Sequence, residues 1–170
     1  MSNPDADDAS RLLDQIDLLL REGIDFSAPS PESTFRYVQL LCSAAELINL
    51  EMVTRYGGRQ GLSRGRHLIE QVVAAAFQTF GSEELHSNPF DKAAMLWRGI
   101  TQGHPFQDGN KRTGFMLAVY FLERVGLPLP SEMPKSEVIA FGLSLSAGQI
   151  RDVNVIAAQL RAWWSRNDDA

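Results

Sequence analysis

A run of eight consecutive apolar residues, Phe115–Leu122, constrains the fold of this chain more than any other feature. On a helical wheel these residues are apolar on every side, which is typical of a helix buried all round by other elements. Gly126 and Pro128 follow the run, and they supply a left-handed cap and a residue that cannot continue a helix. The sequence therefore predicts a helix from Arg112 onward that forms the centre of a domain.

Apolar residues recur at helical spacing through most of the remaining chain, which predicts an all-α fold. The expected core-facing residues of the first three helices are Leu12, Leu13, Ile16, Leu19 and Leu20; Val38, Leu41, Cys42, Ala45, Ile48 and Met52; and Leu68, Ile69, Val72, Val73 and Ala76. The second helix should begin at Ser33 or Thr34 and end at Tyr56-Gly57-Gly58, and the third should begin near Ser63.

Three more helices are expected around the central one. The first begins at Asn88-Pro89, a cap residue followed by proline at the first helical position, and ends around Gly103. It should bury Phe90, Ala93, Ala94, Trp97 and Ile100. The other two are amphipathic and run near Ser136 to Leu145 and Asp152 to Ser165. Between Ala76 and Ser87 the helical period is lost, and this segment is expected to be irregular or a short hairpin.

Length and composition restrict the class of protein. A chain of 170 residues with 44% hydrophobic and 22% charged residues is typical of one soluble globular domain. The net charge of -5 argues against broad binding of nucleic acid. A local basic patch remains possible, because several arginines lie near one another in the sequence and could meet Lys111 and Arg112. These arginines are Arg55, Arg59, Arg64 and Arg66.

Neither a membrane protein nor a secreted one is expected. The first ten residues are acidic and polar, unlike a secretory signal, and no apolar run reaches the roughly 20 residues needed to span a bilayer. The single cysteine, Cys42, lies among apolar residues of a predicted helix face and cannot form an internal disulfide. These features predict a location in the reducing cytoplasm.

The segment from His104 to Gly114 combines residues that a core or a solvated surface would not place together. It lies between two predicted helices and runs into the N-terminus of the buried one. Free backbone N–H groups and the helix dipole form an anion site there, and Gly109 allows close approach of a phosphate. Asn110, Lys111 and Arg112 add donors. A polyphosphate is therefore the expected ligand.

Two further motif residues have chemistry that suits a reaction on this polyphosphate. Asp108 is a single carboxylate beside the predicted phosphate site, an arrangement that commonly holds Mg²⁺. His104 lies outside the phosphate cradle and can act as a general base at cellular pH. Phe106 is expected to anchor the loop in the core.

These residues resemble the signature of the Fic/Doc family, His-x-Phe-x-Asp/Asn/Glu-Gly/Ala-Asn-Gly/Lys-Arg. The matching residues are His104, Phe106, Asp108, Gly109, Asn110, Lys111 and Arg112. The resemblance implies a compact helical bundle around a buried central helix, with a catalytic domain at 46–166 and an N-terminal helical extension at 1–45. It also implies a flap that aligns a target peptide as an added strand, made by Phe77, Gln78, Thr79 and Phe80.

Two positions resemble the death-on-curing (Doc) branch more than the adenylylating Fic branch. Lys111 stands where the Fic branch has glycine, and Phe115 stands where it has a second arginine. The resemblance then implies a toxin-type kinase that uses ATP, or another nucleoside triphosphate, with Mg²⁺ to phosphorylate a protein such as elongation factor Tu and so inhibit translation. Gly109 matches the Fic branch, so protein adenylylation is the alternative, and a non-catalytic nucleotide-binding regulator is a third hypothesis.

Regulation by a separate antitoxin is expected from the same resemblance. Fic proteins are restrained by a helix with the pattern Ser/Thr-x-x-x-Glu-Gly/Asn, which this chain does not match in full. The nearest segment, Thr79–Glu84, lacks the final residue.

Overall fold

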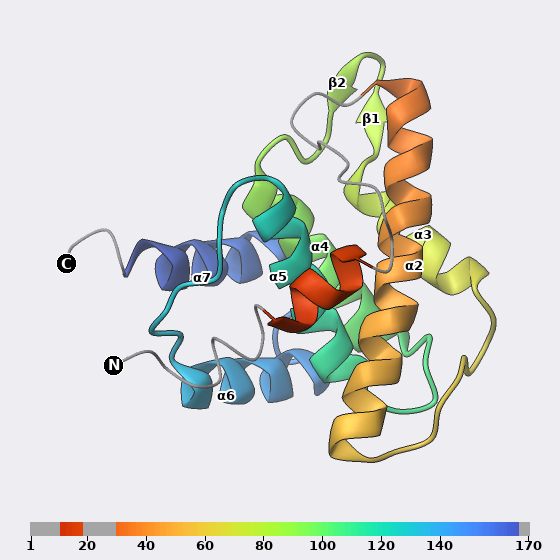
Figure 1. The fold of residues 1–170 in the computed structure, drawn as a ribbon. Helices are drawn as coiled ribbons and strands as arrows, with labels where there is room; N and C mark the ends of the chain where they lie inside the picture. The colour runs from red at the N-terminus through yellow and green to blue at the C-terminus, as the bar shows by residue number, and fades with distance from the viewer. Residues whose placement is uncertain (1–10, 19–29, 167–170) are drawn as a thin grey trace.

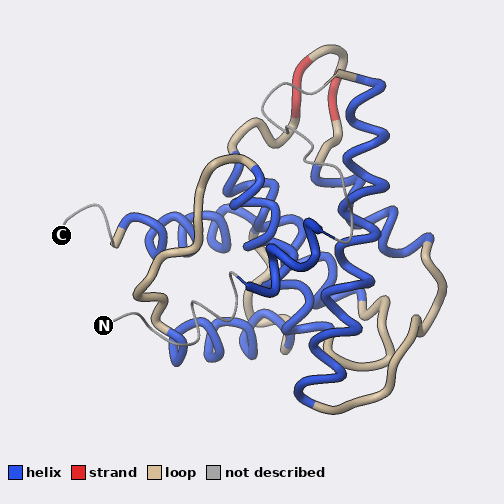
Figure 2. Tube along the Cα trace, viewed as in Figure 1, coloured by secondary structure: helices blue, strands red, loops and turns tan. Residues whose placement is uncertain are grey.

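The computed structural model describes residues 11–18 and 30–166, and within these the fold is helical with one small hairpin (Figures 1 and 2). A short helix covers residues 11–18. It is followed by α2 (Pro31–Tyr56), α3 (His67–Ala76), the strands β1 (Thr79–Phe80) and β2 (Glu83–Glu84), α4 (Pro89–Gly103), α5 (Asn110–Arg124), α6 (Lys135–Ser146) and α7 (Val153–Ser165). The all-α prediction is confirmed. None of the described helices is long and apolar enough to cross a membrane.

Helix α5 is the centre of the domain, as its apolar run predicts. Every residue from Leu117 to Leu122 is buried, and α4, α2 and α6 all pack against this helix. Trp97 of α4 stacks against Phe115 of α5, Phe141 of α6 and Trp163 of α7, with ring centroids 5.0, 5.4 and 6.1 Å away. These aromatic contacts join four helices into one core around α5.

Helix α2 begins three residues earlier than the sequence suggests. Ser30 is the cap: its Oγ accepts the Ser33 N–H at 3.1 Å, and the Ser33 hydroxyl accepts the Ser30 N–H at 2.5 Å. Proline at the first helical position loses no hydrogen bond, because that N–H has no partner within the helix. The expected start at Ser33 or Thr34 is therefore wrong, while the expected end at Gly57 is confirmed.

Helix α3 begins at His67 rather than near Ser63, and residues 57–66 form a loop that we call the α2–α3 loop. Four glycines of this loop have positive φ angles, which a right-handed helix does not allow: Gly57, Gly58, Gly61 and Gly65. These positive φ angles explain why α3 begins at His67 and not near Ser63.

The predicted hairpin between Ala76 and Ser87 is present. Thr79 pairs with Glu84 and Phe80 with Glu83 in antiparallel register. Lys92 in the first turn of α4 holds the hairpin: its Nζ donates to Glu84 Oε2 at 3.0 Å and to the His86 carbonyl. The segment that most resembled an inhibitory helix, Thr79–Glu84, therefore folds as two short strands.

The N-terminal helix at 11–18 belongs to the same core. Leu12, Leu13 and Ile16 are buried within it, and Asp17 accepts hydrogen bonds from the Tyr120 hydroxyl at 2.8 Å and from Arg124 at 2.5 Å. Leu19 and Leu20, which were expected to continue this helix, lie outside the described residues. The expected division between 45 and 46 falls inside the continuous helix α2.

Glu123, near the C-terminal end of α5, carries a charge that the fold disfavours. Burial raises the pKa of its carboxyl above the ordinary value, the hydrogen bond from the Leu129 N–H opposes this shift, and Asp14 and Asp17 add to it. Because the folded state binds the proton more readily than the unfolded state, the ionised carboxylate destabilises the fold at neutral pH. Glutamine would keep an oxygen for the Leu129 N–H and remove the charge.

We therefore expect Glu123→Gln to raise the melting temperature at about pH 7. The gain should shrink towards about pH 4, because the raised pKa lets the folded wild-type carboxyl take up its proton as the pH falls, and the cost of burying its charge then disappears. Thermal melts at both pH values test this, with Glu132→Gln at an exposed position as the control. A lower melting temperature for Glu123→Gln at neutral pH would contradict the prediction.

Candidate active site

The motif begins on the turn between α4 and α5, at residues 104–109, which we call the motif loop, and continues into the first turn of α5. His104 ends α4 in a left-handed conformation with φ 49° and ψ 53°, and among the described residues it alone has a positive φ without being glycine. Such a conformation is costly for most side chains and persists where the surroundings hold it. Ser63 contributes, because its Oγ donates to the His104 carbonyl at 2.5 Å.

The α2–α3 loop lies directly against the motif loop and pairs with it. The Ser63 N–H donates to the Pro105 carbonyl at 2.8 Å, and the Gln107 N–H donates to the Gly61 carbonyl at 3.0 Å. Leu62 and Phe106 form an antiparallel bridge between these bonds, and Phe106 is buried. The predicted anchoring role of Phe106 is confirmed.

Asn110 clamps the motif loop from inside. Its Oδ1 accepts the Phe106 N–H at 3.0 Å and its Nδ2 donates to the Phe106 carbonyl at 2.8 Å. The side chain is 8% exposed. Both of its polar atoms are thus engaged within the protein, and a contact of Asn110 with phosphate stays a prediction.

Asn49 of α2 is a second clamp, which the sequence analysis missed. Its Nδ2 donates to the Asp108 carbonyl at 2.8 Å and to Thr113 Oγ1 at 3.1 Å, and the side chain is 2% exposed. Position 49 follows Ala45 by four residues and precedes Met52 by three, so it lies on the apolar face of α2. A polar residue at a core-facing position was the signal that could have identified it.

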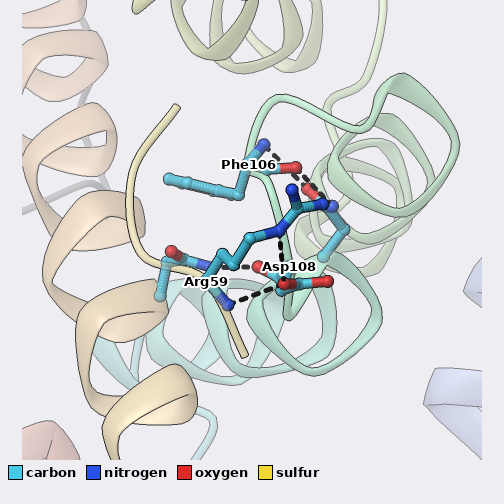
Figure 3. A network of polar contacts seen from close by, with 5 residues as sticks. Arg59, Phe106 and Asp108 are labelled. Carbon is cyan, nitrogen blue, oxygen red and sulfur yellow. Dashed lines mark hydrogen bonds and ion pairs between the residues drawn. The ribbon is translucent and has the colours of Figure 1, made fainter. Parts of the chain in front are cut away.

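Asp108 points out of the motif loop towards the α2–α3 loop. Its Oδ2 accepts the backbone N–H of Arg59 at 2.6 Å, and Arg59 Nε lies 3.6 Å from the same oxygen (Figure 3). The carboxylate side chain is 43% exposed. Gly58 permits this approach, because a Cβ at Gly58 would lie 2.8 Å from the Asp108 Cβ.

The N-terminus of α5 has no side-chain cap, which suits the predicted anion site. Gly109 is its cap with φ 77°, and a Cβ there would lie 3.1 Å from Asn49 Nδ2. Lys111 and Arg112 are exposed in the first turn, and the Arg112 guanidinium lies 4.7 Å from the centre of the Tyr56 ring. Two cations near the positive end of a helix dipole oppose the dipole, and a bound anion would relieve that repulsion.

A pocket of about 730 Å³ opens beside this helix start. Its polar wall includes Asp108, Gly109, Asn110, Lys111 and Arg112, and its apolar walls come from α2, α4, α5 and α6. The apolar residues are Met52, Tyr56, Trp97, Phe115, Met116, Val138, Ile139 and Leu143. The Nε1 atom of Trp97 is buried without a hydrogen-bond partner within the described part of the chain. The volume is in the range of pockets that hold drug-sized ligands and cofactors.

The donor set around Asp108 fits Mg²⁺ bound together with a polyphosphate. In the described ranges no three His, Cys, Asp or Glu side chains gather as a metal site. Asp108 instead offers one half-exposed carboxylate at the helix terminus where phosphate would lie. Mg²⁺ is commonly held by one or two carboxylates, with water and phosphate oxygens completing its shell.

The structure does not bring the predicted flap residues to the motif loop. The hairpin is attached to the first turn of α4, whereas His104 lies at the other end of that helix, which has 15 residues and a length of roughly 22 Å. In Figure 1 the hairpin lies beside the N-terminal end of α2, and the α2–α3 loop begins at its opposite end. Phe77 is buried between Tyr37 and Phe121, while Gln78, Thr79 and Phe80 are exposed.

Substitution of Gly58 tests whether the α2–α3 loop positions Asp108. Gly58→Ala should destabilise the protein by about 1–3 kcal/mol, because it adds a contact with Asp108 to the strain of alanine at φ 126°. Gly57→Ala is the matched control, since Gly57 has φ 84° and open space around its Cβ position. Chemical denaturation measures both variants, and equal losses would show that the contact with Asp108 has no effect.

Comparisons with known proteins identify the family of this chain. The family model for the Fic/DOC family matches residues 43–122, which include α3, α4, the motif loop and most of α5. Protein kinase doc of Escherichia phage P1 is 31% identical over 122 residues, which cover 70% of this chain and 91% of that protein. The chain therefore belongs to the Fic/DOC family, with a distant similarity to the phage kinase.

Proposed function

We propose that this protein is a magnesium-dependent protein kinase that transfers the γ-phosphoryl group of ATP to a Ser or Thr hydroxyl of another protein. The observation that carries the proposal is the meeting of three features at one pocket. These are the open N-terminus of α5, the half-exposed Asp108 carboxylate, and the cations Lys111 and Arg112. Together they suit a metal-bound triphosphate whose reacting end lies at the motif loop.

Four of the motif residues have a direct place in the proposed transfer. The acceptor oxygen forms a bond to the γ-phosphorus while the bond from that phosphorus to the β–γ bridging oxygen breaks. The acceptor proton passes to His104, and ADP leaves with the electron pair of the broken bond. Lys111, Arg112 and the N–H groups of the first turn of α5 bind the phosphate oxygens. Mg²⁺ held at Asp108 would neutralise phosphate charge.

Phosphoryl transfer is favoured over adenylylation by two positions and by the similarity to a kinase. Lys111 adds a charge where the adenylylating branch has glycine, and Phe115 packs its ring on Trp97 where that branch has a second arginine. The relative identified above is a kinase by name. Gly109 is the observation that favours adenylylation, so a nucleotidyl product is the second candidate outcome.

The experiment is an incubation with ATP, Mg²⁺ and elongation factor Tu, followed by intact-mass analysis of the factor. A phosphoryl increment supports the kinase, and an adenylyl increment supports the alternative. Nucleotide binding without any modification of elongation factor Tu, or of the proteins of a cell extract, would favour a non-catalytic regulator. Omission of Mg²⁺ should abolish either modification.

Restraint of this activity would come from a cognate antitoxin in the cytoplasm. The support is indirect: the segment that most resembles an inhibitory motif, Thr79–Glu84, forms the hairpin, far along α4 from the motif loop. Expression of the chain alone should then arrest growth. Co-expression with the neighbouring gene of its operon should restore growth.

A further inference from the structure

Arg59 on the α2–α3 loop lies close to the reacting end of the proposed site, although it is outside the signature. Its backbone N–H donates to Asp108 Oδ2 at 2.6 Å, and its Nε lies 3.6 Å from the same oxygen. In Figure 3 its side chain reaches over the motif loop past the Asp108 carboxylate. Arg59 is thus tied at its backbone to the residue predicted to hold Mg²⁺.

The backbone of Arg59 is well fixed, whereas its side chain is not. The α2–α3 loop is held to the motif loop by the bonds at Gly61 and Ser63 and by the bridge from Leu62 to Phe106. The Arg59 side chain is 79% exposed, and its ion pair with Asp108 spans 3.6 Å. An exposed pair of this kind adds little to stability, so the guanidinium can leave the carboxylate at low cost.

Two other arginines near this loop, Arg55 and Arg66, pair with carboxylates outside the motif. Arg55 pairs with Glu51 at 2.9 Å, and Arg66 pairs with Glu46 and Glu70. Within the described part of the chain, Arg59 is the arginine whose paired carboxylate belongs to the motif itself. Its contacts with Asp108 therefore place Arg59 beside the predicted phosphate site.

We propose that Arg59 is a catalytic residue that binds the γ-phosphoryl group during transfer. This inference rests on the proposed kinase function. With Mg²⁺ and ATP bound, Asp108 would hold the metal, and the guanidinium of Arg59 would be free to bind the triphosphate. Its planar fork then donates to γ-phosphate oxygens on which negative charge is concentrated. In the absence of nucleotide, the ion pair with Asp108 keeps the Arg59 side chain near the site where the γ-phosphate would bind.

The role proposed for Arg59 would supply the positive charge that position 115 lacks. That side chain packs on Trp97 with ring centroids 5.0 Å apart and lines the pocket, so position 115 supplies no charge to the phosphates. Lys111 and Arg112 lie on the first turn of α5, and Arg59 approaches from the α2–α3 loop. Cations on two different elements can contact the triphosphate from two sides.

The test compares Arg59→Gln, Arg59→Lys and Arg64→Gln, the last removing an exposed arginine of the same loop. Calorimetry with Mg²⁺ measures the affinity for a non-hydrolysable ATP analogue and for ADP. Arg59→Gln should weaken the analogue about 10- to 100-fold and leave ADP within about twofold, because only the γ-phosphate contact is lost. The affinity of Arg59→Lys for the analogue should lie between those of wild type and Arg59→Gln, since lysine keeps the charge but lacks the planar guanidinium fork. Arg64→Gln should match wild type.

Turnover gives a second readout. Arg59→Gln should lower the rate of phosphoryl transfer about 100- to 1000-fold with an unchanged melting temperature. Equal affinity of wild type and Arg59→Gln for the analogue would overturn the inference alone. Tighter binding of the analogue by Arg59→Gln would also overturn the inference, because Arg59 would then hinder nucleotide binding by holding Asp108. Failure of the wild type to bind either nucleotide would instead refute the proposed function.

Discussion

Replacement of His104 by asparagine should lower the rate of protein modification about 10²- to 10⁴-fold, the usual contribution of a general base. Asparagine is the informative choice because position 104 has φ 49°. Asparagine tolerates the left-handed region, whereas alanine there would add strain that confuses the result. The rate is measured by intact mass of the target over time at saturating ATP.

The melting temperature and nucleotide affinity of His104→Asn should equal those of wild type, because the side chain is exposed and does not line the pocket. His67→Asn is the matched control, since His67 is exposed at the start of α3. Modification by His104→Asn at the wild-type rate would exclude His104 as the base. Loss of nucleotide binding together with activity would show instead that His104 acts on the nucleotide.

Substitution of Asn110 by leucine should give the largest loss of stability among the motif residues. The Phe106 N–H and carbonyl would each lose a partner in a buried position, at about 1–3 kcal/mol apiece. A total of about 2–6 kcal/mol corresponds to a fall in melting temperature of roughly 4–24 °C for a chain of this length. Nucleotide binding and transfer should fall with it, because the motif loop loses its shape.

Asn154→Leu is the control for Asn110→Leu. Asn154 is exposed in the first turn of α7, so this substitution should change stability by less than about 0.5 kcal/mol. Unfolding by urea, followed by circular dichroism, separates the two variants. If Asn110→Leu were as stable as wild type yet failed to bind nucleotide, Asn110 would be a phosphate ligand and its bonds to Phe106 would be of little consequence.

The helices were predictable because each depends on a short stretch of chain. The period of apolar residues places α4, α5 and α7 within a few residues of their observed bounds, and the caps at Asn88 and Asp152 mark two of the starts. The start of α2 at Pro31 was missed because Ser33 and Thr34 are also residue types that cap helices. A proline at a first helical position and a proline in a loop look alike without the hydrogen bonds of Ser30.

The role of the hairpin segment as a target-binding flap stays a prediction. Alternation of apolar and polar residues correctly predicted the hairpin, but a local pattern carries no information on which end of α4 it occupies. The segment that pairs with the motif loop is the α2–α3 loop. The glycines of the α2–α3 loop allow it to lie close to the motif loop. Both segments are irregular, so no periodicity in the sequence predicts their pairing.

By itself the sequence determined the helical class, the buried central helix, and the position of the motif at the start of that helix. It also identified the residue types that suit a base, a metal and a phosphate, since these depend on composition and spacing within eleven residues. Only the tertiary structure decided that Asn49 holds Asp108 in place and that Arg59 lies beside its carboxylate. Asn49 and Asp108 are separated by 59 positions in the chain, and Arg59 and Asp108 are separated by 49 positions. These contacts form because the packing of α2 against α5 brings the two loops together. Local helix and turn propensities do not predict contacts between residues so far apart in the chain.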